Sequence, residues 1–204
     1  TNTAFISASS RTDPVAANNQ AAVALYAQKA DAVQAVVTSG QGSVIVYTDT
    51  QGLTTTVEVP PGAVTDTITL VYTPLPEPPY PAPTGLPLAG HAFALEAYRN
   101  CTPLPGYAFQ APVVVTIRYS DADIAGLEEG TLALYRWNGT EWEDAACGPY
   151  ERHPGANWLA VSVCHLSPFA LLGSPVPVGG VTVPVRGGAG TVWLWGVLLT
   201  VVIG

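Results

Sequence analysis

The sequence contains no methionine and unusually few charged residues. Charged side chains make up 11% of the 204 residues, and seven Lys and Arg stand against fifteen Asp and Glu, a formal net charge of -8. Typical soluble domains have about 25% charged residues. Without a basic stripe, a nucleic acid is excluded as a partner. Because methionine is absent, Thr1 is not an initiator, and we expect that a signal peptide has been removed.

Cysteine is also scarce, with only three residues: Cys101, Cys147 and Cys164. Residues 142–166 read as two strands joined by a loop, and pairing of those strands would bring Cys147 and Cys164 to disulfide distance. The sequence predicts this pair, although Cys101 could pair with either of the others. A disulfide fits an oxidising compartment, so we expect an extracytoplasmic, membrane-associated protein.

The sequence has no recognisable metal-binding spacing. The three histidines, His91, His153 and His165, are far apart. The stretch DADIAGLEEG begins like a calcium loop, but Ala125 and Leu132 occupy two positions that need oxygen ligands. We interpret it as an acidic surface turn, and we expect neither a metal nor a cofactor.

Long helical patterns are almost absent, and the middle of the chain alternates with a period of two. From Ser43 to Gly173, eight short runs rich in β-branched and aromatic residues are separated by turn residues. This pattern predicts a mainly β fold, an antiparallel β-sandwich. Between Pro74 and Pro87, seven of fourteen residues are proline. We expect an extended surface loop there, either a rigid spacer or a docking edge that displays Tyr80.

The N-terminal region, residues 1–41, is predicted to be a leader with an amphipathic helix. Residues 14–37 carry the helical signal, with Asp13 as a cap and Pro14 at the first position. Ala22, Leu25, Tyr26, Val33 and Val37 share one face at helical spacing. The helix either packs on its own domain, or frays as a leader, or docks onto a partner.

The C-terminal region contains the only long apolar run. Residues 174–190 are predicted to be a Pro/Gly-rich linker and residues 191–204 a membrane anchor. Eighteen uncharged residues from Gly187 would reach about 27 Å as a helix, close to the hydrocarbon thickness of a bilayer. Trp193 and Trp195 suit the interface, and Leu198 and Leu199 would contact lipid. The alternative is a segment buried in the fold.

Three motifs together resemble the ZU-five-type β-sandwich of zona-occludens proteins, netrin receptors and ankyrins, especially bacterial surface-protein relatives. They are TTTVEVPPGAV, the strand–acidic loop–strand stretch 113–143, and VSVCHLSPFALLG. The resemblance covers residues 42–173. It implies an interaction or scaffolding module with no substrate pocket and no cofactor. Some relatives cleave themselves at His-Phe-Ser, which maps here onto His165, Leu166 and Ser167.

The trio Cys164, His165 and Ser167 contains the side chains used in covalent catalysis. His165 and Ser167 are two apart on a predicted strand and would share a face. A third triad member and a G-x-S-x-G elbow are both missing. We therefore predict a non-enzyme with no small-molecule substrate. Its function is an extracytoplasmic structural or interaction domain tethered by its C-terminus, with protein partners or itself. Two alternatives stay open: an accessory subunit of a membrane complex, and a self-cleaving domain cut between Leu166 and Ser167.

Overall fold

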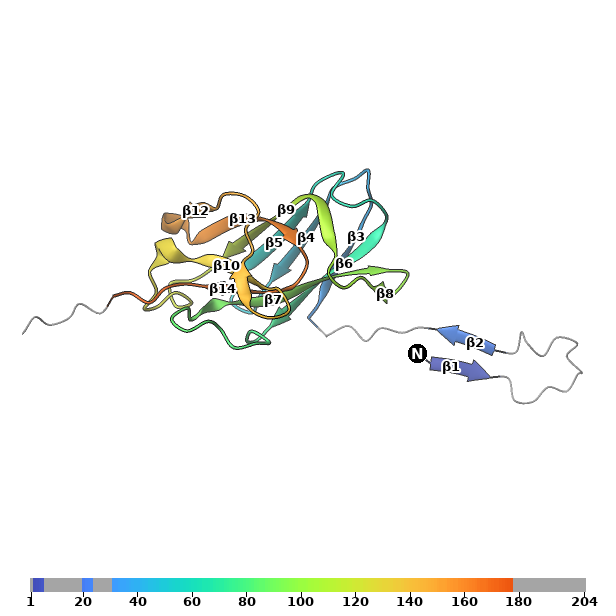
Figure 1. The fold of residues 1–204 in the computed structure, drawn as a ribbon, viewed down its shortest axis with the longest axis horizontal. Coiled ribbons are helices and arrows are strands. Elements are labelled where there is room, and N and C mark those ends of the chain that lie inside the picture. The colour runs from blue at the N-terminus through green and yellow to red at the C-terminus, as the bar shows by residue number, and fades with distance from the viewer. Residues whose placement is uncertain (1, 6–19, 24–30, 178–204) are drawn as a thin grey trace, which may run out of the picture.

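The computed structural model describes residues 2–5, 20–23 and 31–177, and two antiparallel sheets packed face to face dominate it (Figure 1). The seven-stranded sheet has the order β11–β10–β14–β7–β6–β3, with β8 paired to β7. Its strands are β3 Val33–Val37, β6 Ile68–Leu75, β7 Leu88–Arg99, β8 Thr102–Pro103, β10 Ala133–Trp137, β11 Trp142–Asp144 and β14 Pro168–Leu172. The predicted antiparallel sandwich is confirmed.

The second sheet has five strands in the order β12–β13–β9–β5–β4. They are β4 Ser43–Thr48, β5 Thr54–Val59, β9 Ala108–Arg118, β12 Glu151–His153 and β13 Trp158–His165. A separate two-stranded sheet pairs β1, Asn2–Phe5, with β2, Gln20–Val23. The only helical elements among the described residues are two 3₁₀ turns, Glu129–Thr131 and Pro154–Ala156.

Alternation along each strand sorts side chains between the core and the outer faces. On β9, Val113, Val115 and Ile117 are fully buried, whereas the residues between them are only half-buried. A row of stacked rings crosses the core. Tyr47 on β4 stacks on Tyr72 of β6, which stacks on Phe93 of β7, which stacks on Phe169 of β14, with centroid distances of 4.9–5.3 Å. This row joins the two sheets.

The prediction of a helix over residues 14–37 is wrong where the structure describes the chain. Residues 20–23 form β2, and residues 33–37 form β3, which pairs in register with β6 from Val33 opposite Tyr72 to Val37 opposite Ile68. Three of the five β3 residues are valine, which favours strands. Ladder hydrogen bonds and burial of Val37 outweigh the helical spacing. The sandwich therefore begins at Val33 rather than at residue 42, while residues 14–19 and 24–30 lie outside the described residues.

The predicted membrane anchor, including Trp193, Trp195, Leu198 and Leu199, lies outside the described residues. The first residues of the predicted linker belong to the sandwich: Pro175 bridges to Leu127, and the Val176 amide donates to the Gly126 carbonyl at 2.8 Å. Within the described part of the chain, no helix is long and apolar enough to cross a membrane.

The proline-rich stretch lies against the outer face of the seven-stranded sheet. Trp142, Ala170 and Leu172 form a second buried cluster on that face, against which Leu86 and Leu88 pack. The Trp142 indole N–H donates to the Pro81 carbonyl at 3.0 Å, and the Tyr80 ring stacks on Trp137 with centroids 4.0 Å apart. These contacts hold the loop against the outer face of the seven-stranded sheet, where it covers the second cluster.

Replacing Trp142 with phenylalanine should loosen this cover. The indole donor to Pro81 and part of the buried ring area disappear, so we expect about 1–2 kcal/mol of lost stability. We also expect severalfold faster amide hydrogen exchange across residues 82–88. Trp158→Phe on β13 is the matched control, because Trp158 stacks on His153 away from the loop. Equal exchange in the loop of both variants would contradict this account.

Candidate interaction surface

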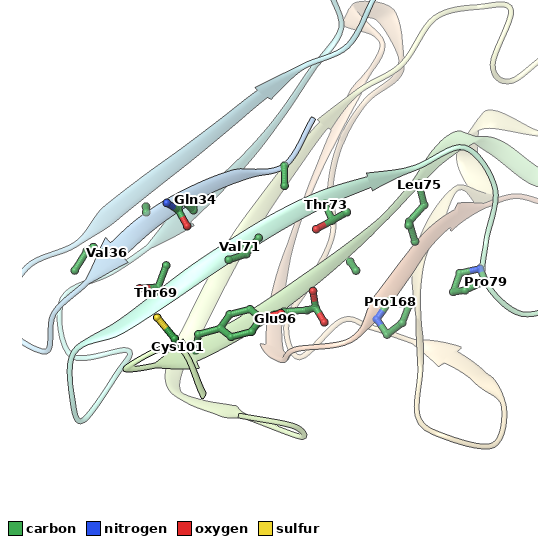
Figure 2. Close-up of a pocket in the computed structure, with 14 residues that line it drawn as sticks. Gln34, Val36, Thr69, Val71, Thr73, Leu75, Pro79, Glu96, Cys101 and Pro168 are labelled. Carbon is green, nitrogen blue, oxygen red and sulfur yellow. The ribbon is translucent and has the colours of Figure 1, made fainter. Parts of the chain in front are cut away.

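The part of the seven-stranded sheet's outer face that the proline loop leaves uncovered forms a groove over β3, β6 and β7 (Figure 2). Its volume is about 710 Å³. Apolar side chains make up much of the lining, with Val36, Val71 and Leu75 among them, and Glu96 is the only charged lining residue. Pro79 of the loop and Pro168 of β14 close one end of the groove, as Figure 2 shows.

The pleat of β6 and β7 explains why a hollow forms here. Leu70 and Tyr72 point into the core, so Val71 and Thr73 face outward, and on β7 the small Ala94 faces outward between large core residues. Small outward residues in the middle of the sheet leave room between larger ones at the rim. The groove also reaches Cys101, which is exposed and is not part of a disulfide.

The structure does not place His165 and Ser167 on one strand. β13 ends at His165 and β14 begins at Pro168, so Ser167 lies in the connection between the two sheets. The prediction that they share a strand face is therefore wrong. Pro168 starts the new strand, a position that proline tolerates because its missing N–H is not needed there.

The backbone and hydroxyl of this connection are used for packing. Ser167 is 9% exposed, and its Oγ donates to the Trp137 carbonyl. The Leu166 amide donates to the Tyr107 carbonyl at 3.1 Å, and the Ser167 carbonyl accepts from the Leu95 amide at 3.1 Å. The His165 side chain is exposed. The serine hydroxyl therefore anchors the connection between β13 and β14 to the end of β10 through a hydrogen bond.

The disulfide between Cys147 and Cys164 is confirmed, with Cα atoms 6.0 Å apart. Cys147 follows β11 of one sheet and Cys164 lies on β13 of the other, so the bond ties the two sheets together. The Cys147 amide also donates to the Ser162 carbonyl at 2.9 Å. A covalent link reinforces a contact that backbone pairing already makes.

The acidic stretch after β9 is a structured turn. The Asp123 carboxylate accepts hydrogen bonds from the amide and hydroxyl of Ser120, at 2.8 and 2.6 Å. It lies 3.8 Å from Nε2 of His91, whose pKa burial lowers despite that carboxylate. Gly90 has a φ of +73°, and a Cβ there would lie 2.3 Å from Asp123 Oδ1. No group of three or more potential metal ligands occurs among the described residues.

The groove is the feature that sequence reasoning missed. A signal for it was present: β6 reads ITLVYTPL, in which apolar residues fall on both faces rather than on alternate positions. Such a strand is covered on both sides or carries a binding surface. On the outer face of the seven-stranded sheet, the proline loop covers one part and the groove occupies another.

No protein-family model matches the chain, and neither does any curated protein. The resemblance to ZU-five-type domains therefore rests on the three sequence motifs alone.

Proposed function

We propose that the protein is a non-catalytic, extracytoplasmic interaction domain tethered to a membrane by its C-terminal segment. The observation that carries this proposal is the Cys147–Cys164 disulfide, which ties the two sheets of the sandwich. Such bonds form and persist outside the reducing cytosol. The low charge content and the apolar run over residues 191–204 support a position at a membrane surface.

The candidate catalytic residues support a structural role. Cys164 is consumed in the disulfide, and the Ser167 hydroxyl is bound to a backbone carbonyl. In self-cleavage this hydroxyl would have to attack the carbonyl of Leu166 instead. Its engagement with Trp137 argues against the self-cleaving alternative. The ZU-five-type resemblance points in the same direction, towards scaffolding or adhesion.

The open groove is the surface on which we place a protein partner. The groove is concave, and its lining combines apolar side chains with one carboxylate, that of Glu96, although Val36 is the only one of its large apolar residues that is exposed. A partner strand or loop with apolar side chains would fit between Val36 and Leu75, and a cationic group would find Glu96. The same groove suits the alternative role of an accessory subunit in a membrane complex. Native sizing after mild detergent extraction separates a lone domain or homomer from a hetero-complex.

Deleting residues 187–204 should release the domain from the membrane. Burying each large apolar side chain of this segment is worth about 1.5–3 kcal/mol, so the segment partitions into lipid. We expect the full chain in the membrane fraction and the shortened chain in the soluble fraction, with its disulfide intact and a β-type circular dichroism spectrum.

A matched pair of full-length variants controls for the loss of chain length. Leu198→Lys combined with Leu199→Lys should weaken membrane association, because charges inside the apolar run are costly. Val176→Lys, at an exposed position on the sandwich, should not. A shortened chain that aggregates, or a full chain that stays soluble without detergent, would show that the tail belongs to the fold.

A further inference from the structure

In each sheet, the two edge strands differ in length and in charge. At one edge of each sheet the strand has three residues and carries charge: β11 contains Glu143 and Asp144, and β12 contains Glu151, Arg152 and His153. Short, charged edges prevent pairing with other chains. At the opposite edges lie β3 and β4, which have five and six residues and no charged residue. The protective devices are thus absent on one side of the sandwich.

Exposed apolar side chains gather on the same side. Among the described residues, the large apolar side chains that are exposed are Val36, Val44, Val46, Tyr80 and Val176. The first three lie on β3 and β4. On β4, Val44 and Val46 are 57% and 51% exposed and share the outer face, while Ile45 between them is buried in the core. This strand pairs with β5 in unbroken register from Ser43 to Thr48.

We propose that β4 is a self-association edge at which a second copy of this chain adds its own β4, antiparallel, to form one continuous ten-stranded sheet. This goes beyond the proposed groove by assigning a second contact surface, and it rests on the proposed role as an interaction domain. Identical strands paired antiparallel obey two-fold symmetry, so one edge serves both copies. β4 carries no charged residue, so pairing two copies of it places no like charges directly opposite each other, even though the net charge of the chain is -8.

The pleat restricts the register of this pairing. The two-fold axis must align outer faces with outer faces, so it passes at a residue rather than between two residues. An axis at Ile45 places Val44 opposite Val46 of the second copy, and this pairing occurs twice. Four exposed valines are covered, and both copies of Ile45 stay on the core side. Cross-strand β-branched pairs of this kind stabilise sheets.

The register gives a test with an internal rescue. In full-length protein in mild detergent, sedimentation velocity over a concentration series should show a monomer–dimer equilibrium. Val46→Lys should raise the dimer Kd at least about tenfold, because lysine on an edge opposes pairing. Adding Val44→Glu together with Glu58→Gln, which removes the carboxylate paired with position 44 on β5, should bring the Kd back to within about threefold of the original. The new carboxylate at 44 then lies opposite the new ammonium at 46 of the second copy.

Val176→Lys is the matched control, since Val176 is 50% exposed and lies on neither β4 nor the groove lining. We expect it to leave the Kd unchanged. A chain that is monomeric at every concentration overturns the proposal. So does a dimer that responds to Val176→Lys but not to Val46→Lys, or one insensitive to both, which would arise through the tail. Strong protection from hydrogen exchange, in a monomer, of the β4 amides that face away from β5 would assign the edge to the N-terminal strands instead. None of these results affects the membrane fractionation that tests the tether.

Discussion

Replacing Phe93 with alanine should lower the free energy of unfolding by about 3–5 kcal/mol, a large part of the stability of an ordinary domain. Phe93 is fully buried on β7 and stacks on both Tyr72 and Phe169. Truncation removes one of the two inner rings of the four-ring row, which has one ring on each of β4, β6, β7 and β14. A cavity forms where neighbouring strands are held by their own ladders and cannot collapse to fill it.

Urea denaturation followed by tryptophan fluorescence measures this loss. Phe93→Leu keeps most of the buried volume and should cost clearly less than the alanine variant. Val36→Ala, at an exposed position on β3, should stay within about 0.5 kcal/mol of the original chain. If Phe93→Ala were no worse than Val36→Ala, the stacked row would not be part of a packed core.

Removing the disulfide through the double substitution Cys147→Ala and Cys164→Ala should cost about 3 kcal/mol. The bond closes a loop with a sequence separation of 17, and cross-linking a loop of that size removes about this much chain entropy from the unfolded state. The loss should appear as a lower denaturation midpoint, with the β-type spectrum retained under native conditions.

Reduction of the original chain should give the same shift as the double substitution. Cys101→Ala provides the control, because Cys101 is exposed and not disulfide-bonded. It should leave stability unchanged both with and without reductant. A Cys101→Ala variant as unstable as the double variant would mean that Cys101 competes for one of the two partners.

The sandwich could be predicted because its strands carry a strong local signal. β9 contains an unbroken run of β-branched residues from Val113 to Ile117, β13 alternates apolar residues with smaller or polar ones, and turn residues separate neighbouring strands. The disulfide could be predicted because Cys147 and Cys164 are close in sequence and the segments that carry them pair, as the bridge between Ala146 and Val163 shows. Each of these inferences needs only residues that are close together in the sequence.

β3 and the groove could not be predicted, because both depend on distant residues. The run VQAVV lies in a stretch with helical spacing, and only pairing with β6, more than thirty residues later, makes it a strand. The groove forms because the proline loop covers β10 and β14 and stops at Pro79. Likewise, the sequence predicts a strand through Ser167 because nothing local shows where the chain crosses between the sheets.

The position of β14 has a consequence for how the protein folds. This strand is late in the sequence, yet it lies inside the seven-stranded sheet between β7 and β10. Until residues 168–172 have been synthesised, β7 is paired with β6 and β8 but lacks β14, and the ring of Phe93 lacks Phe169. Assembly therefore depends on contacts between residues far apart in sequence, which makes folding slow and leaves strand edges exposed meanwhile. A chain interrupted before Pro168 cannot close its core, so the domain matures only after nearly all of its sequence has left the ribosome.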